Sequence, residues 1–596
     1  MNAMYGFHGY YERVDLGSGK SRRIAIPERI LRRYLGGVGL GSWLLHLESV
    51  AGTDPLSPES PLIFCFSPLV GTRITTSAKF AVVAKSPLTG YLCDGLSSSA
   101  FALSAKARGI DALVFVGCCS EPSEWIHGTL RPTRFWGRSA AETEHGLRSH
   151  GEVAAIGVAG EHRVRLATIS NGGRHAGRGG LGAVMGSKRL KAIAIGGEVA
   201  TPIAKPDRVA SWARELSRRS QGEATARYRE LGTVSNLATF NRLAVLPTRN
   251  FQHSQFEGTD ALETLHPKGA AKHERSSCAH CTIGCEHRYA GDAGAATRLE
   301  YESLFALGPL CGIDDPDAVL AATRLCDELG IDTVSAGGTV AFAMECGERG
   351  HLCTADVPRF GDAEGLLRLL SDMAHRRGIG ALLADGSRRA AIAIGEQTLY
   401  FAPQIKGLEI PGYEPRALQA MALGFAVGTR GADHNRSGAY EVDFSGEAHR
   451  LKGDARTARL ALATENRAAV LDSLILCKFL RGVFDDFYSE TADLLASVTG
   501  WDCDAAELER VGHRIVDLRK AFNIREGWTP EEDTLPPRFF AEPLTAGASA
   551  GAQISRERLQ EMIDSYYSAR GWTSTGYLSQ ATLRSIAEDT CAEEGA

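Results

Sequence analysis

The sequence carries its clearest structural signal in the segment Asn171-Gly-Gly-Arg-His-Ala-Gly-Arg-Gly-Gly-Leu-Gly-Ala-Val-Met-Gly186. Glycines let backbone amides approach an anion, and Arg174 and Arg178 can bind a phosphate bidentately. The run 181–191 predicts a helix, whose N-terminus would add a favourable dipole for the anion. The segment lacks the ending of a Walker A loop and the strict glycine spacing of a dinucleotide fingerprint. We therefore expect a phosphate-binding turn; the alternative is a glycine-rich turn that packs against a sheet.

Short apolar runs alternate with helix-like runs in the first third of the chain, which is typical of an α/β domain. Strands are predicted at 61–67, 80–84, 112–117, 153–158 and 192–196, and helices at 41–47 and 98–108. After residue 204 the pattern is mainly helical, with helices predicted at 315–329, 335–347, 363–377, 460–480 and 508–521. The first of these has an N-cap at Asp315, a proline at its first position and Gly330 at its end. The predicted fold class is α/β plus α, a β-rich N-terminal domain (1–204) followed by two mainly helical domains (205–405 and 406–596).

Composition limits the class of protein. The chain has 596 residues, 44% apolar and 23% charged, with a net charge of −5, so nothing favours binding to nucleic acid. No apolar run approaches the roughly 18 residues of a membrane span, and the N-terminus has no apolar core of a signal peptide. We expect a cytoplasmic protein of two to four domains that contacts neither nucleic acid nor membrane.

Three of the fourteen cysteines are clustered, in Cys278-Ala-His-Cys281-Thr-Ile-Gly-Cys285. In a reducing compartment such a cluster indicates a metal rather than disulfides. Thiolates suit both iron–sulfur clusters and zinc, and the spacing fits either. A fourth ligand must come from elsewhere, and Cys477, in an apolar helical run, is the best candidate. The alternative is a zinc site with a histidine as fourth ligand, for which the candidates are His273, His280 and His287.

Two acidic segments have a related pattern, Asp327-Glu-Leu-Gly-Ile-Asp332 and Asp472-Ser-Leu-Ile-Leu-Cys477. A carboxylate can accept paired N–H bonds from an amino-pyrimidinone ring such as that of a pterin. An aspartate near a helix end is more commonly a cap or a surface charge. Both interpretations stay open on the residues alone.

Taken together, these residues resemble the aldehyde:ferredoxin oxidoreductase family, over nearly the whole chain. The resemblance includes Lys85-Ser-Pro-Leu-Thr-Gly90, Ala176-Gly-Arg-Gly-Gly-Leu-Gly-Ala-Val-Met-Gly-Ser-Lys188, Glu300-Tyr-Glu-Ser303, Cys326-Asp-Glu-Leu-Gly-Ile-Asp-Thr333 and Asp533-Thr-Leu-Pro536. It implies that the N-terminal domain is a base for a bis-pterin tungsten or molybdenum site, over which the two helical domains close.

The resemblance also implies roles for individual residues. The cluster ligands of a [4Fe–4S] centre would be Cys278, Cys281, Cys285 and Cys477. The active-site acid would be Glu302 and the imidazole His434, with Tyr413 near the substrate. The cofactor contacts would be Lys79, Ser97, Ser98, Arg174, His175, Gly177, Arg178, Asp327, Gly330, Asp332, Asp472 and Leu476.

Several positions depart from the family pattern. Lys79 replaces an arginine that links cluster and pterin, and it keeps the charge but loses the planar fork. Leu96 replaces an asparagine near the magnesium ion that bridges the pterin phosphates. The other departures are Ser98 and Ser99 for glycines, Ile475 for a glycine of the second pterin motif, and Ala321 for a glutamate that binds a bridging iron between subunits. They put the surroundings of the first pterin and that inter-subunit iron in doubt.

The implied function is oxidation of an aldehyde to a carboxylic acid, with electrons leaving through the cluster to a ferredoxin or a small iron–sulfur subunit. The assembly would be a homodimer or a hetero-oligomer. One alternative is the catalytic subunit of an aroyl-CoA reductase of the benzoyl-CoA type. Another, of a different class, is a zinc-stabilised scaffold that has lost the cofactor.

Overall fold

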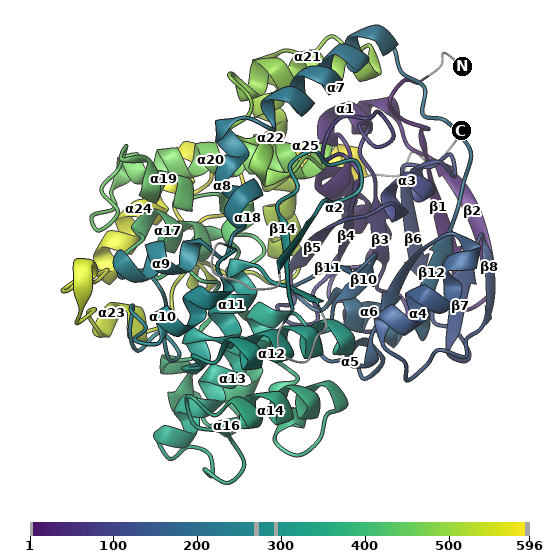
Figure 1. The fold of residues 1–596 in the computed structure, drawn as a ribbon. Coiled ribbons are helices and arrows are strands. Elements are labelled where there is room, and N and C mark those ends of the chain that lie inside the picture. The colour runs from purple at the N-terminus through teal and green to yellow at the C-terminus, as the bar shows by residue number, and fades with distance from the viewer. Residues whose placement is uncertain (1–3, 268–272, 291–295, 591–596) are drawn as a thin grey trace.

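The computed structural model describes residues 4–267, 273–290 and 296–590. Figure 1 shows the β-rich N-terminal part on one side, in purple and blue, and the helical remainder beside and below it. The predicted fold class, a β-rich N-terminal domain followed by mainly helical structure, is confirmed.

Two six-stranded sheets form the N-terminal part. The first has the order β2-β1-β6-β3-β4-β5 and the second β11-β10-β9-β12-β7-β8. The strands of the first are β1 Tyr10–Asp15, β2 Lys20–Ala25, β3 Leu62–Cys65, β4 Lys79–Lys85, β5 Leu92–Ser98 and β6 Ala112–Val116. Those of the second are β7 Ser123–Ile126, β8 Thr129–Pro132, β9 Glu152–Ile156, β10 Ile169–Asn171, β11 Arg174–Ala176 and β12 Leu190–Ile195.

A shared apolar core holds the two sheets together. Aromatic rings dominate it, because Phe64 and Phe80 pack with centroids 5.9 Å apart and Phe115 meets Trp125 edge-on at 5.5 Å. The second pair joins β6 of one sheet to β7 of the other. Aromatic pairs add to the free energy gained by burying their area. The two sheets are therefore packed together through one apolar core.

Some glycines of the glycine-rich segment are needed for close packing, in addition to the turn that the segment makes. Helix α6, Leu181–Ser187, begins after Gly180 in a left-handed conformation. A Cβ at Gly186 would lie 2.5 Å from the Gly160 carbonyl carbon, so only glycine fits there. At Gly177, by contrast, an added Cβ would meet only Thr168 Cγ2, at 3.7 Å. The C-terminal glycines thus serve packing, whereas Gly177 faces open space.

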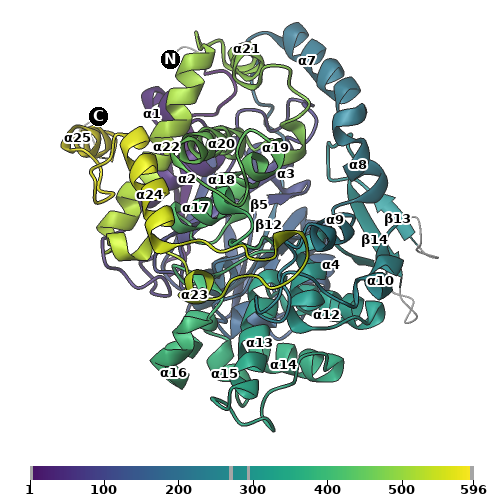
Figure 2. The ribbon, with the colours of Figure 1, turned by 90° about the vertical axis from the view of Figure 1, so that its left-hand side faces the viewer.

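The rest of the chain is mainly helical. Its longer helices are α7 Pro206–Arg219, α12 Pro316–Leu329, α13 Thr333–Glu348, α14 Ala363–His375, α20 Ala455–Leu474, α21 Phe487–Thr499, α22 Ala505–Arg525 and α24 Arg556–Arg570. A small antiparallel sheet of β13 His273–Ser276, β14 Glu286–Ala290 and β15 Ala296–Arg298 carries the clustered cysteines in its β13–β14 connection. Figure 2 shows this sheet at one edge, below α8 (Glu223–Leu231). Within the described ranges, no helix combines the length and apolar composition needed to span a bilayer.

Three predicted helices were wrong at their ends. The prediction at 98–108 began too early, because Ser98 ends β5 and helix α3 runs over Phe101–Lys106. The prediction at 181–191 ran too far, since β12 begins at Leu190. The prediction at 460–480 missed the end of α20, where Ile475 takes a left-handed conformation with φ 58°. Glu302, His434 and Cys477 all lie near the end of a helix or in a short helix, where the sequence predicts boundaries least well.

The turn between α12 and α13 joins the base to the helical part. Asp315 caps α12 as predicted, accepting from the amides of Asp317 and Ala318. At the other end Gly330 is left-handed, and its carbonyl accepts from the Thr168 amide at 2.9 Å. The Asp332 amide donates to Leu166 O at 3.0 Å. The turn is thereby fixed against the second sheet.

A substitution at Gly157 tests the contact between the α12–α13 turn and the second sheet. An alanine Cβ there would lie 2.6 Å from the Leu329 carbonyl carbon and 2.9 Å from Gly330 N. We expect Gly157→Ala to lower the free energy of unfolding by about 1–3 kcal/mol, measured as a lower midpoint of thermal unfolding. Gly482→Ala is the control, because its Cβ would meet only Ala224 Cβ, at 3.9 Å. Equal midpoints for the two variants would contradict the proposed junction.

Candidate active site and metal centre

One large cavity of about 420 Å³ lies where the base meets the helical part. It is lined by β4 and β5, by the glycine-rich segment, by the α12–α13 turn and by the end of α20. Of the residues predicted for the site, those on its wall are Lys79, Ser97, Ser98, Arg174, His175, Gly177, Arg178, Cys278, Cys285, Glu302, Asp327, Asp332, His434, Asp472, Leu476 and Cys477. Cys281, Gly330 and Tyr413 are not on the wall but adjoin it through Cys278, Asp332 and His434.

The four candidate cysteines gather around Lys79. Burial alone would lower the pKa of the Lys79 ammonium, but the thiols of Cys477, Cys278, Cys281 and Cys285 together raise it. A hydrogen bond with the Cys281 thiol lowers the pKa of Cys278. The chain thus brings Cys477 to the other three from about two hundred residues downstream. Within the described part of the chain, no three histidine, cysteine, aspartate or glutamate side chains are grouped as ligands of one metal ion.

Two of the histidines considered as zinc ligands, His273 and His287, have other ring partners. His273 Nε2 and His287 Nδ1 share a hydrogen bond of 2.5 Å, and the rings stack at 4.7 Å. The second nitrogen of His287, Nε2, lies 3.3 Å from the Tyr228 carbonyl. Both ring nitrogens of His287 are therefore engaged away from the thiols. His280 is exposed, and its carbonyl, not its ring, accepts from the Thr76 amide.

The glycine-rich segment and the α12–α13 turn face each other across the cavity. His175 Nε2 lies 3.3 Å from Asp327 Oδ1, and Arg178 Nε lies 3.4 Å from Asp332 Oδ2. Asp332 also caps α13 by accepting from the Ser335 amide. The cap interpretation therefore holds for Asp332, and its side chain also lines the cavity; contact with a pterin stays a prediction.

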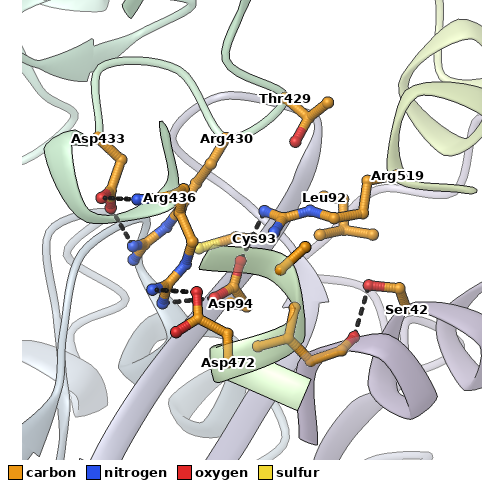
Figure 3. Close-up of polar contacts among 12 residues, drawn as sticks. Ser42, Leu92, Cys93, Asp94, Thr429, Arg430, Asp433, Arg436, Asp472 and Arg519 are labelled. Carbon is orange, nitrogen blue, oxygen red and sulfur yellow. Dashed lines mark hydrogen bonds and ion pairs between the residues drawn. The ribbon is translucent and has the colours of Figure 1, made fainter. Parts of the chain in front are cut away.

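A buried network of charged side chains, unforeseen from the sequence, crosses the floor of the cavity (Figure 3). Asp94 of β5 is held by Arg436 Nη2 at 2.5 Å and by Arg519 Nη2 at 2.7 Å. Arg436 Nη1 reaches Asp472 Oδ2 at 3.0 Å. Burial alone would raise the pKa of Asp94, but the arginines, Arg436 first, lower it to about 2. The only local hint was the charged run Arg430-Gly-Ala-Asp-His-Asn-Arg436.

Arg430 extends this network toward the glycine-rich segment. It forms an ion pair with Asp433 and donates to Gly177 O at 2.9 Å. Asp433 in turn caps the short helix α18, His434–Ser437, by accepting from the Asn435 amide at 2.8 Å. The cap fixes the position of His434 at the start of that helix.

Glu302 and His434 meet at the cavity wall. Glu302 lies in the first turn of α11 (Tyr301–Leu307), and its Oε2 accepts from the Gly412 amide at 3.1 Å. Its Oε1 lies 3.6 Å from His434 Nε2, too far for a hydrogen bond. Burial raises the pKa of Glu302 to about 7 and lowers the pKa of His434 to about 3. Near neutral pH the carboxyl group can therefore exchange a proton, while the imidazole is uncharged.

Several buried polar atoms beside the cavity lack a hydrogen-bond partner in the described residues. They are Glu302 Oε1, His434 Nδ1, Arg178 Nε, Arg430 Nε, Arg436 Nε and Asn171 Oδ1. Unpaired buried polar atoms cost free energy and are rare unless another group supplies the partner. Donors, acceptors and three thiols on the wall of one large cavity, with the Cys281 thiol beside them, suit a polar cofactor bound next to a thiolate-ligated cluster.

Three of the departures from the family pattern, Lys79, Leu96 and Ser98, line the cavity. Leu96 lines it, and its side chain offers no oxygen to a cation. Ile475 takes a left-handed conformation that β-branched residues rarely adopt. A Cβ at Gly37 would lie 2.6 Å from Ile475 Cγ1, so α2 (Gly37–Glu48) packs directly on this turn.

Comparison with known proteins agrees with this geometry. The family model described as "Aldehyde ferredoxin oxidoreductase, N-terminal domain" matches residues 11–197, and the one for "domains 2 & 3" matches residues 209–587. The chain therefore belongs to the aldehyde ferredoxin oxidoreductase family and is an oxidoreductase of that family.

Individual relatives extend over nearly the whole chain. A tungsten-containing aldehyde ferredoxin oxidoreductase of Pyrococcus furiosus is 35% identical, with 98% of this chain and 99% of the relative covered. One of Thermococcus kodakarensis is also 35% identical, over 96% and 97%. A subunit named "Aliphatic sulfonate oxidoreductase, WOR-like subunit", from P. furiosus, is 27% identical over 98% and 97%.

A solved structure shares the fold. It is the active site complex BamBC of benzoyl coenzyme A reductase with 1,5 dienoyl-CoA, matched with a TM-score of 0.85. The match covers 99% of this chain and 98% of that chain at 24% sequence identity. At this identity the likeness concerns the fold alone.

A substitution at Asp94 tests whether the buried charge network stabilises the folded protein. We expect Asp94→Asn to lower the free energy of unfolding by about 3–5 kcal/mol, because it leaves Arg436 and Arg519 without their carboxylate. Since folding lowers the pKa of Asp94 from 3.8 to about 2, its stabilisation is complete above pH 4 and is lost as the pH falls toward 2. The midpoint of thermal unfolding, measured from pH 7 to pH 3, checks both effects. A variant as stable as the natural protein at pH 7 would contradict this role.

Proposed function

We propose that this chain oxidises aldehydes to carboxylic acids at a bis-pterin tungsten or molybdenum site in the large cavity. Electrons would leave through a [4Fe–4S] cluster held by Cys278, Cys281, Cys285 and Cys477, to a ferredoxin or a small iron–sulfur subunit. The main support is the combination on one cavity wall of a carboxyl group that titrates near neutrality, a neutral imidazole and a set of thiols. Tungsten and ferredoxin appear in the names of relatives 35% identical to this chain.

The bound group would accept two electrons from the substrate. Oxidation of an aldehyde also adds the oxygen of water and releases two protons, so a base is needed beside the carbonyl carbon. Glu302 is suited to this, because its pKa of about 7 lets it take a proton at neutral pH and return it to solvent. Its Oε1 faces the space between α11 and α18.

His434 would orient the substrate. A neutral imidazole can donate an N–H to the carbonyl oxygen and stabilise the negative charge that grows there. The Asp433 cap and the stacked ring of Tyr413, with centroids 5.0 Å apart, hold the imidazole in place. The protein thus contributes position and proton transfer, while the cofactor contributes the redox chemistry.

Several residues would hold the cofactor groups. Arg174, Arg178 and the glycine-rich backbone suit the phosphates, and Asp327, Asp332 and Asp472 suit the pterin rings. Lys79 would lie between the cluster and the first pterin. The Leu96 side chain would offer no oxygen to a magnesium ion, so this chain could contribute only backbone carbonyls there.

Glu302 gives the sharpest test of the proton step. We expect Glu302→Gln to retain tungsten or molybdenum and iron but to lose at least about 100-fold in kcat, the usual contribution of a positioned base. In the natural enzyme kcat/KM for an aldehyde should rise with pH and level off above about 7, because the ionised carboxylate is the active form. Assays with a dye as electron acceptor, run from pH 5 to pH 9, measure both the loss in kcat and the pH dependence of kcat/KM.

The matched control is Glu300→Gln, which removes the neighbouring carboxylate that pairs with Arg298 at 3.9 Å. It should keep kcat within a few-fold and leave the pH profile unchanged. Full activity of Glu302→Gln would remove Glu302 from the mechanism.

A substitution at Cys477 tests whether this residue is the fourth ligand of the cluster. We expect Cys477→Ala to lose most of its iron and its cluster signal in electron paramagnetic resonance, because three thiolates remain for a centre that needs four. Cys353→Ala, at an exposed cysteine, is the control and should keep its iron. Unchanged iron in Cys477→Ala would exclude Cys477 as a ligand.

A further inference from the structure

A two-residue turn forms the tip of the hairpin in the glycine-rich segment. Strands β10 and β11 pair antiparallel with Asn171 opposite Arg174, so Gly172 and Gly173 make the turn between them. Their φ angles are 56° and 69°, the left-handed values that such tight hairpin turns require. The amides of these two glycines lie outside the ladder of hydrogen bonds between the strands. They therefore need acceptors from elsewhere in the molecule.

The carboxyl group of Glu144 supplies these acceptors. Glu144 lies on α4 (Ala140–Leu147), which packs against β9, β10 and β12. Its Oε2 accepts from the Gly172 amide at 2.7 Å, and its Oε1 accepts from the Ser170 hydroxyl at 2.6 Å. The Gly173 amide is a further donor to the carboxyl group. All three donors belong to the hairpin, so Glu144 occupies the position that an external anion would take at this turn.

The burial of Glu144 makes these hydrogen bonds necessary. Its side chain is half-buried, and burial raises the pKa of the carboxyl group above its usual value. The Ser170 hydroxyl, His175 and the turn amides act in the opposite direction on this pKa and favour the ionised form. A buried carboxylate costs free energy unless donors satisfy it, and hydrogen bonds to an ionised acceptor are the stronger kind. The position of the hairpin is therefore tied to that of α4.

The opposite side of the hairpin faces the large cavity. Arg174 and His175, the first residues after the turn, line the cavity, whereas Glu144 and the turn glycines do not. Asn171 donates from Nδ2 to Ser97 Oγ on β5 at 2.7 Å. The hairpin is thus held from one side by α4 and from the other by β5. A shift of its tip would move the guanidinium and the imidazole that line the cavity.

We infer that Glu144 is a positioning residue for cofactor binding, a built-in anion that fixes the hairpin so that Arg174 and His175 meet the cofactor. The inference rests on the proposed function for the chemistry of that cofactor, a pterin that carries phosphate. It divides the predicted phosphate-binding turn into two parts. The two turn glycines bind a carboxylate of the protein itself, and Arg174 and Arg178 remain the candidates for the phosphate.

Release of the cofactor measures this role directly. Cofactor-loaded natural enzyme and Glu144→Ala would be dialysed anaerobically, and the pterin still bound would be followed by its fluorescence after oxidation. We expect Glu144→Ala to release pterin at least about tenfold faster, because the turn loses hydrogen bonds to a charged acceptor. Glu144→Gln, which keeps the size of the side chain but loses its charge, should release pterin at an intermediate rate. Release from both variants at the natural rate would overturn the inference.

The matched control is Glu142→Ala, on the same helix. Glu142 is exposed, and its side chain closes the capping box at Ser139, so its loss weakens α4 without removing a contact to the hairpin. This variant should release pterin at the natural rate. Release as fast as from Glu144→Ala would assign the effect to the stability of α4 and overturn the inference.

A small anion gives a second readout, which a purely structural role of Glu144 would not change. Formate can occupy the space vacated in Glu144→Ala and accept from the turn amides. It should slow the release of pterin from that variant, whereas sodium chloride at the same ionic strength should not. Release that is fast and unaffected by formate would overturn the inference.

Aldehyde turnover separates this inference from the proposed function. Natural enzyme that oxidises aldehydes, with equal pterin release from Glu144→Ala, would leave the proposed function standing and overturn the inference. Natural protein that retains a pterin but oxidises no aldehyde would contradict the proposed function, and pterin release from Glu144→Ala would still decide the inference. Natural protein that contains no pterin would contradict both.

Discussion

The buried charge network around Asp94 is the constraint on which the cavity depends. The buried carboxylate of Asp94, on the edge strand β5, cannot be buried alone, and its partners Arg436 and Arg519 come from helices more than three hundred residues later. Burying one partner without the other would cost several kcal/mol. The helical part must therefore close over the base in one orientation, with Asp472 and the end of α20 at the cavity wall.

That orientation places the ends and caps of helices around the cavity. Asp332 and Asp433 each cap a helix whose first turn faces the cavity, and Ile475 ends α20 two residues before Cys477. Helix caps fix side chains through backbone hydrogen bonds, so they position groups with little freedom. The pKa of Glu302 follows from the same enclosure, because burial is its largest cause.

The sequence predicts much of the fold where the signals are local. Strands β3 and β6 are continuous apolar runs, β4 and β12 are mainly apolar, and α12 has a cap, a proline and a terminal glycine. Strand β2 was missed because its side chains are largely exposed and polar. The three cysteines of one loop were visible by spacing, and Cys477 was the best candidate for a fourth ligand on the residues alone, which the family resemblance then supported. Asp94, Arg430 and Arg519 could not be predicted, because each is explained only by a partner distant in the chain.

Metal analysis of anaerobically purified protein tests the central claim most directly. The account predicts tungsten or molybdenum, organic pterin, and iron at the four-to-one ratio of one [4Fe–4S] cluster to one heavy metal atom. Protein that contains zinc and neither iron nor a heavy metal would contradict it.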